Sequence, residues 1–150
     1  MPPDTRTRVP ENTAASVNES IQRQIEESVR YYASCPDRIP KRLRELDAEW
    51  DIERAIEANA AVIAFGGVFL GATRDRRWLT LPALVTGFLF QHAIQGWCPP
   101  VPILRRLGFR TSYEIELERN ALKALRGDFA HVRQAPDRAA AALEAARQAA

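Results

Sequence analysis

One thiol in this sequence stands where it could do chemistry. Cys98 lies near the end of a long uncharged run, is followed by Pro99-Pro100, and precedes Arg105 and Arg106 by a few residues. The thiolate is the reactive form of cysteine and nearby cations favour it, so a reactive Cys98 could accept sulfane sulfur as a persulfide or bind a soft metal. A position at the C-terminal end of a helix acts in the opposite direction, because the helix dipole raises the pKa of a thiol there. The competing interpretation is structural, a small polarizable side chain that fits a tight turn.

Three polar residues precede this thiol within the same uncharged run. Gln91 and Gln95 share a helical face, and His92 lies beside Gln95 at a spacing of three. Polar groups inside an apolar segment are functional candidates by default. Hydrogen bonding between helices or at the membrane surface is the favoured alternative. His92 and Cys98 are about 9 Å apart along a helix, so we do not expect them to act as a pair.

Other signatures of catalysis or ligand binding are missing from the sequence. It has no glycine-rich phosphate loop, no His-Glu-x-x-His, no Cys-x-x-Cys and no triad pattern. The carboxylates from Glu45 to Glu57 lie close in sequence to Arg42, Arg44 and Arg54, which is typical of a solvated ion-pair surface. The net charge of +2 is spread over segments of mixed sign and does not indicate a nucleic-acid partner. We therefore expect no cofactor and no metal, and a non-enzymatic role is favoured.

The elements that must position the thiol are two apolar segments. No Asp, Glu, Lys or Arg occurs in residues 58–73 or from Trp78 to Leu104. We expect apolar helices over 58–73 and 78–98, joined by the short Arg74–Arg77 link into an antiparallel transmembrane hairpin spanning residues 58–99. The first segment has 16 residues, about 24 Å of helix, and is short for a span. Trp78 and Trp97 are typical interfacial anchors of the second. A hairpin buried in a soluble helical bundle is the competing fold, but it should show a polar face, and none follows Asn59.

The flanking sequence predicts further helices, so the fold class is all-α. Apolar residues recur every three or four positions between Ser16 and Tyr32. A second apolar stripe is formed by Ile39, Leu43, Leu46 and Trp50, and its helix is expected to continue without a break into the first apolar segment. Thr111 and Glu114 form a capping-box pattern that opens a later helix. The predicted parts are a disordered tail (1–14), cytoplasmic amphipathic helices (15–57), the hairpin, a cytoplasmic helix (100–127) and an alanine-rich tail (128–150).

Charge and small residues predict orientation and packing of the hairpin. Nine Lys or Arg residues lie near its outer ends and three in its link, which places both termini in the cytoplasm. A bridge between Cys35 and Cys98 is then not expected, since that compartment is reducing. Small residues at helical spacing let helices approach closely in lipid, either within one hairpin or in a homodimer. The small residues at this spacing are Ala60, Ala64, Gly67, Gly71, Ala83 and Gly87.

The end of the hairpin resembles a known family. The segment Gly96-Trp97-Cys98-Pro99, followed by Ile103-Leu104 and Leu107-Gly108, is similar to the YgaP-like inner-membrane transmembrane domain found behind rhodanese modules. The likeness covers roughly residues 53–111. It implies a bacterial inner-membrane hairpin that pairs into a four-helix unit, often beside sulfur-transfer proteins. No rhodanese domain precedes the hairpin here, so sulfurtransferase activity is not implied.

Three hypotheses for function follow. The first is a dimeric, non-enzymatic membrane scaffold or docking module. The second is a membrane protein that handles sulfur or sulfide, with Cys98 as persulfide acceptor or ligand and a separate soluble sulfurtransferase as partner. The third is a soluble helical interaction protein.

Overall fold

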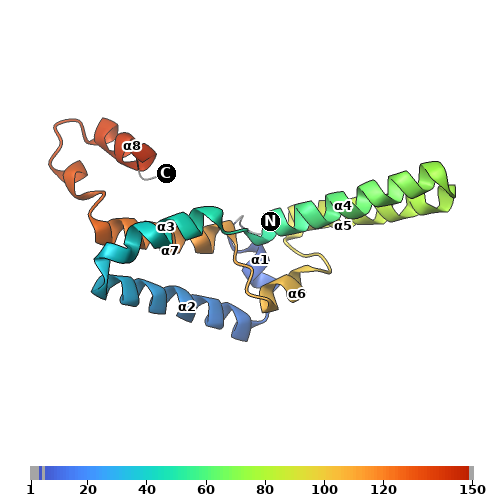
Figure 1. The fold of residues 1–150 in the computed structure, drawn as a ribbon, viewed down its shortest axis with the longest axis horizontal. Helices are drawn as coiled ribbons and strands as arrows, with labels where there is room; N and C mark the ends of the chain where they lie inside the picture. Colours follow the sequence, from blue (N-terminus) through green and yellow to red (C-terminus); the bar gives the residue numbers. More distant parts are fainter. Residues whose placement is uncertain (1–3, 5, 149–150) are drawn as a thin grey trace. The chain divides into compact units, whose positions relative to one another are not determined.

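The computed structural model describes residue 4 and residues 6–148 of the 150-residue chain. In this part of the chain there are helices and turns but no strand, which confirms the predicted all-α class. In chain order the helices are α1 (Arg8–Glu11), α2 (Ala15–Ser34), η1 (Pro36–Arg38), α3 (Ile39–Ala48), α4 (Ile52–Thr73), η2 (Arg76–Leu79), α5 (Thr80–Gln95), α6 (Val101–Arg106), α7 (Ser112–Arg126), η3 (Ala130–Arg133) and α8 (Arg138–Gln148) (Figure 1). They form two compact units, the first from Met1–Ile21 with Trp50–Tyr113 and the second from Gln22–Glu49 with Glu114–Ala150.

The first unit is dominated by α4 and α5, which lie side by side and are joined through η2 (Figure 1). With 22 residues α4 is about 33 Å long, and α5 with 16 residues is about 24 Å long. Asp51 caps α4, because its Oδ1 accepts a 2.7 Å hydrogen bond from the Arg54 backbone N–H. Gly96 ends α5 in a left-handed conformation with φ of 74°.

Three helix boundaries differ from those predicted. The helix expected to run unbroken into the first apolar segment stops at Ala48, because Glu49 is extended and Asp51 starts a new helix. The helix expected over 78–98 forms an α-helix only at Thr80–Gln95, since the left-handed Gly96 stops it before Cys98. The helix expected over 100–127 is split into α6 and α7, with Gly108 between them at φ of 93°.

The start of the chain also differs from the predicted disordered tail over 1–14. Residues 8–11 form α1, and the Val9 side chain is 1% exposed. Residues 1–3 and 5 lie outside the described part of the chain. The prediction failed here because one apolar residue among prolines and charges gives no periodic pattern, while the structure buries that residue against distant partners.

The second unit has a core built by α2, α3 and α7. Ile39, Leu43 and Leu46 of α3 are buried with Ile115 and Leu122 of α7, and Tyr32 of α2 packs against them. These three α3 residues occupy the predicted apolar stripe. The predicted alanine-rich tail, 128–150, contains η3 and the helix α8, in which Ala145 is 2% exposed; residues 149–150 lie outside the described part.

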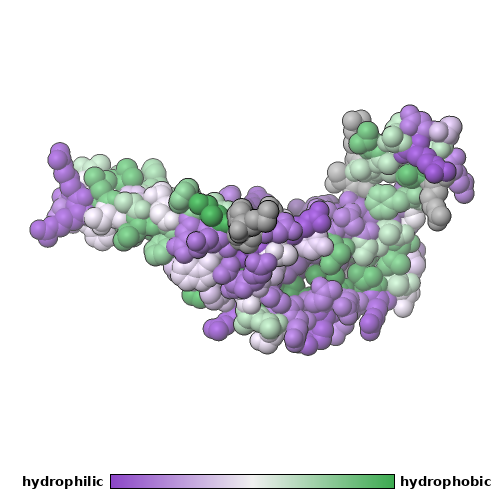
Figure 2. Space-filling model, turned by 180° about the vertical axis from the view of Figure 1, so that it is seen from behind, coloured by the Kyte–Doolittle hydropathy of each residue, from purple (hydrophilic) through white to green (hydrophobic). Residues whose placement is uncertain are grey.

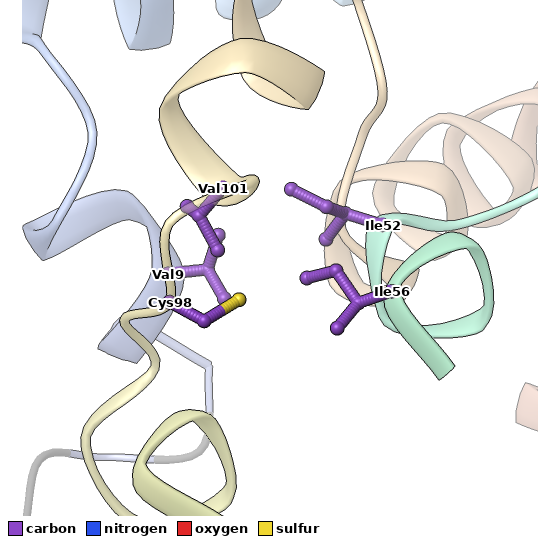
Figure 3. Close-up of a cluster of buried hydrophobic side chains, with 5 residues drawn as sticks. All are labelled: Val9, Ile52, Ile56, Cys98 and Val101. Carbon is purple, nitrogen blue, oxygen red and sulfur yellow. The ribbon is translucent and has the colours of Figure 1, made fainter. Parts of the chain in front are cut away.

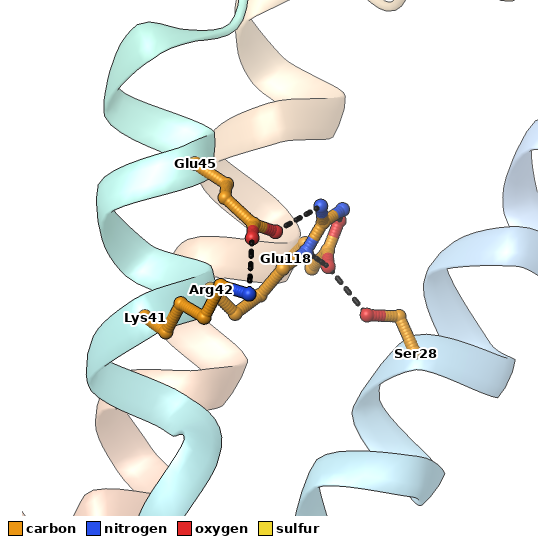
Figure 4. A network of polar contacts seen from close by, with 5 residues as sticks. All are labelled: Ser28, Lys41, Arg42, Glu45 and Glu118. Carbon is orange, nitrogen blue, oxygen red and sulfur yellow. Dashed lines mark hydrogen bonds and ion pairs between the residues drawn. The ribbon is translucent and has the colours of Figure 1, made fainter.

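A buried carboxylate connects the three core helices of this unit (Figure 4). Glu118 of α7 is fully buried and accepts hydrogen bonds from Ser28 Oγ at 2.5 Å and from Arg42 Nε at 2.9 Å and Nη2 at 3.2 Å. Arg42 also reaches Glu45 on its own helix. Burying a carboxylate is costly unless it is paired and hydrogen-bonded, and here α2 and α3 supply both.

Candidate functional site

The surface of the α4–α5 pair is strongly apolar. Phe65, Val62 and Phe90 are 74%, 72% and 69% exposed, although such side chains are normally buried in soluble domains. Other large apolar residues more than 40% exposed on these helices and their link are Ile63, Val68, Phe69, Trp78, Leu79, Leu84, Phe88 and Ile94. In Figure 2 the surface of this pair is mostly hydrophobic up to the hydrophilic link between the helices.

One helical stretch in the described residues, Pro36–Thr73, is long and apolar enough by length and composition to cross a membrane. It contains α3, the break before Asp51 and α4. Only 22% of its most apolar 18-residue window is buried. The core helix of a soluble protein would be mostly buried, so the exposure of α4 is the unusual property. α5 alone, at 16 residues, falls below the length that this criterion requires.

The small residues of α4 are where the two helices meet. A Cβ added to Gly67 would lie 2.5 Å from Pro82 Cδ, and one added to Gly71 would lie 2.6 Å from Leu79 Cδ2. Both glycines are buried, and Ala64 and Ala60, one and two turns before Gly67, are half-buried. The GxxxG pair therefore permits close approach of α4 to η2 and α5 within one chain.

The small residues of α5 lie elsewhere. Ala83 and Gly87 are both exposed, and a Cβ added to Gly87 would meet no atom within 4 Å. Gly66 of α4 is similarly open at its Cβ position. The small residues predicted to mediate helix packing are thus divided: those of α4 pack inside the pair, and those of α5 face outward.

Cys98 lies in the turn after α5 and is buried at 2% exposure. It belongs to a cluster with Val9, Ile52, Ile56 and Val101, toward which its Sγ points (Figure 3). Burial in these apolar surroundings raises the pKa of the Cys98 thiol, and the nearby Val101 backbone N–H opposes this only in part. The thiol is therefore protonated at neutral pH and enclosed, which favours the structural interpretation over the reactive one.

The two arginines after Cys98 separate to different surroundings. Arg105 is 1% exposed and donates from Nη2 to Asn18 Oδ1 at 2.8 Å and from Nη1 to the Phe109 carbonyl at 3.2 Å. Arg106 is exposed at the end of α6. Arg105 therefore holds the start of α2 and the α6–α7 turn together.

The polar residues of α5 differ in burial and in hydrogen bonding. His92 is 5% exposed, and neither ring nitrogen has a hydrogen-bond partner within the described residues. Gln91 Nε2 lies 3.4 Å from Gln95 Oε1 on the same face, as the spacing predicts. His92 is not part of the buried cluster around Cys98.

The contact that the sequence analysis missed is the docking of α1 on the end of α5. Arg8 Nη1 donates to the Ala93 carbonyl at 2.7 Å, and Asn12 Nδ2 donates to the Gln95 carbonyl at 2.9 Å. These carbonyls belong to the last turn of α5, where the helix cannot satisfy them itself. α1 thus caps α5 and places Val9 over Cys98. No sequence signal joins residues more than 80 positions apart.

A cavity of about 510 Å³ opens between α4, α5, the Cys98–Pro100 turn and α6. Its walls include Ala60 and Ile63 of α4, Phe88 and Leu89 of α5, and Ile103 of α6. Asn59 also lines it, but the Asn59 amide Nδ2 already donates to the Ala55 carbonyl at 2.7 Å. The cavity is therefore apolar in character.

Within the described residues no group of three or more His, Cys, Asp or Glu side chains is placed to hold a metal ion. No protein-family model, curated protein or solved structure matches this chain. The interpretation therefore depends on the chain's own geometry.

Proposed function

We propose that this protein is a helical membrane scaffold whose α4 and α5 cross the bilayer as an antiparallel hairpin. The observation that carries the proposal is the exposure of large apolar side chains around both helices. Leaving these side chains in water costs about 25 cal/mol for each Å² of apolar surface, whereas lipid removes that cost. The uncharged part of α4, residues 58–73, is about 24 Å of helix and is short for a hydrocarbon core of about 30 Å, and the long side chains of Arg54 and Arg74 at its ends can reach toward the two interfaces.

The shorter α5 is extended at its start by η2, so that residues 76–95 form a nearly continuous helical segment. Trp78 begins this segment with 46% exposure, and Trp97 follows its end half-buried. Tryptophan at both ends is typical of spans that reach the two interfaces. Trp50 before α4 is 47% exposed and stacks with Arg54, whose guanidinium carbon lies 4.6 Å from the ring centroid, which adds a third interfacial aromatic.

Both termini are proposed to lie in the cytoplasm of a bacterial cell, with the Arg74–Arg77 link on the other side of its inner membrane. The excess of Lys and Arg at the outer ends of the hairpin supports this orientation. The likeness to the YgaP-like transmembrane domain, carried by Gly96-Trp97-Cys98-Pro99, supports the bacterial inner membrane as the location.

The proposed role is docking rather than catalysis. The thiol that could act is enclosed by Val9 and its neighbours. The second unit supplies folded, charged helices in the cytoplasm, on which a soluble partner could assemble. Nothing in the surroundings of Cys98 favours sulfur transfer over this role, because burial holds the thiol in its protonated form.

A homodimer is proposed through the outward face of α5. Two helices bury little of each other, and the exposed Ala83 and Gly87 offer a surface for close helix approach. Gly87→Leu should weaken dimers without disturbing the pair, since its Cβ position is open. Gly67→Leu should instead disturb the pair. Cross-linking in membranes would measure the dimer, and an unchanged dimer yield in Gly87→Leu would contradict this interface.

Alkaline carbonate extraction of membranes from expressing cells tests the central proposal. The chain should stay in the pellet at high pH, and a cysteine placed at Arg76 should be labelled only from outside the inner membrane. A chain that is released by carbonate and is monodisperse without detergent would be the soluble helical protein of the third hypothesis.

A further inference from the structure

The apolar cavity at the base of the α4–α5 pair is sized for a small ligand. At about 510 Å³ it falls within the range of about 300–1,000 Å³ that is usual for ligand pockets. A helix from another chain, about 10–12 Å across with its side chains, would need a long open groove instead. Three helices and a turn line this partly open cavity, which suits a flexible aliphatic chain.

The cavity lies where α4 changes from charged to apolar. Glu57 is the last charged residue of α4, and the cavity walls on this helix extend from Ile56 to Ile63. This interval is about 10 Å of helix. In the proposed membrane orientation it corresponds to the depth at which lipid headgroups give way to acyl chains.

An exposed arginine lies on the face of α6 that lines the cavity. Ile103 lines the cavity and is 62% exposed, Leu107 is 71% exposed, and Arg106 is exposed on the same face of α6, since spacings of three and four share a face. Residues 99–113 contain three arginines and no Asp or Glu. Arg105 and Arg110 are buried, so Arg106 is the arginine of this segment that is open to solvent.

We propose that this cavity binds one acyl chain of an anionic glycerophospholipid from the cytoplasmic leaflet, with the phosphate beside Arg106. The inference deepens the proposed function and rests on it, because it assumes that α4 and α5 lie in lipid. The site would fix the hairpin at a defined depth and make its stability depend on membrane composition.

The test uses the full chain, purified in mild detergent and depleted of lipid, with native mass spectrometry to count bound molecules. Dioleoyl phosphatidylglycerol, dioleoyl phosphatidylcholine and oleate are added separately at equal concentration. The wild-type chain should retain one phosphatidylglycerol more tightly than either of the others. Equal retention of phosphatidylcholine, or displacement of phosphatidylglycerol by oleate, would overturn the assignment.

Adjacent alanines give a matched pair of variants. Ala60 lines the cavity and Ala61 is exposed on the outside of α4. Ala60→Phe should fill the cavity and reduce phosphatidylglycerol retention at least tenfold, whereas Ala61→Phe should retain it. Equal retention by both variants would show that the lipid is bound elsewhere.

The headgroup contact is tested in the same way. Arg106→Gln should reduce the preference for phosphatidylglycerol about fivefold, the effect of roughly 1 kcal/mol for one basic residue near anionic lipid. Arg77→Gln, in the link at the far end of the pair, should not change it. An unchanged preference in Arg106→Gln would contradict the headgroup assignment.

Two further measurements keep this inference separate from the membrane proposal. The first uses the wild-type chain alone: phosphatidylglycerol should raise its unfolding temperature and phosphatidylcholine should not. An equal rise in unfolding temperature with both lipids would count against the site. A chain released by carbonate that still binds phosphatidylglycerol through Ala60 would refute the hairpin crossing alone. An integral chain without this selectivity would refute the cavity site alone.

Discussion

Arg8 and Gly96 are in backbone contact: a Cβ on Gly96 would lie 2.5 Å from both the carbonyl carbon and the carbonyl oxygen of Arg8. Glycine is therefore required at position 96 for two reasons: its φ of 74° is strained for other residues, and the backbone of α1 leaves no room for a Cβ. The contact places Val9 in the cluster that encloses Cys98. The N-terminal residues thus cover one side of a cysteine almost 90 positions later.

Gly96→Ala should displace α1 from the end of α5. The strain of a left-handed alanine is about 1–2 kcal/mol, and the overlap with the Arg8 backbone adds to it. Gly108→Ala is the matched control, since Gly108 has φ of 93° but no atom within 4 Å of its Cβ position. Thermal unfolding in detergent should show the larger loss for Gly96→Ala. Equal losses would mean that the Arg8 contact contributes nothing.

Cys98 should react slowly with maleimide at neutral pH in a Cys35→Ser background. Burial both encloses the thiol and raises its pKa above the ordinary 9.0, so labelling should increase only at more alkaline pH or on unfolding. Adding Gly96→Ala should accelerate the reaction, because Val9 no longer covers the thiol. Rapid labelling of the folded wild-type chain, or a stable persulfide on Cys98 after exposure to sulfane sulfur, would restore the sulfur-handling hypothesis.

Gly67→Leu should destabilise the α4–α5 pair, because its side chain would overlap with Pro82. Gly66→Leu, one position earlier, should be tolerated, since its Cβ position is open. We expect a loss of about 1–3 kcal/mol for the first variant, as is usual for overpacked sites, and little change for the second. Unfolding in detergent, followed by circular dichroism, measures both. Similar stability of the two variants would contradict the packing of Gly67 against Pro82.

Glu118→Gln should destabilise the second unit by about 2–4 kcal/mol. The range is slightly below that for breaking a fully buried ion pair, because the Arg42 side chain retains 24% exposure. Glu45→Gln removes a carboxylate that is 47% exposed from the same arginine and should cost less than about 1 kcal/mol. Denaturant unfolding of both variants makes the comparison, and a reversed order would show that Glu118 is not the residue that holds α2 and α3 to α7.

Stability should depend on pH through Glu53. Burial raises the Glu53 pKa above its ordinary 4.5, and Asp51 adds to this while Arg8 and backbone N–H groups oppose it. The Glu53 carboxyl group therefore binds a proton more tightly in the folded state than in the unfolded state. This difference stabilises the fold below about pH 4.5, and the stabilisation is lost as pH rises through the raised pKa of the folded state. Glu53→Gln should be more stable than wild type at pH 7, with the difference shrinking toward pH 4. A difference that is constant across this range would exclude Glu53 as its source.

Local patterns predicted the parts of this fold that depend on neighbours in sequence. The stripe of Ile39, Leu43 and Leu46 gave the buried face of α3, and the Gly67–Gly71 spacing marked a point of close helix approach. Helix ends were less predictable, since a single residue decides them. The backbone is extended at Glu49 and at Asp51, which caps the next helix, and this short break leaves no periodic signal.

The surroundings of the candidate thiol were not predictable from local patterns. Cys98 is followed closely by Arg105, which in sequence resembles an activating cation, yet the Arg105 guanidinium bonds to Asn18 and Phe109. Val9 covers the thiol from the other end of the chain. Pairings across 80 to 90 residues, including that of Arg42 with Glu118, depend on the tertiary fold rather than on spacing.

The burial of Val9 against Val101 has a consequence for biogenesis. A ribosome must add about 90 residues after Val9 before Val101 exists, which takes several seconds at about 5–20 residues per second. During that interval the first helix has no docking surface, while α4 and then α5 emerge. Closure of the N-terminal segment over the base of the α4–α5 pair is therefore a late event in maturation.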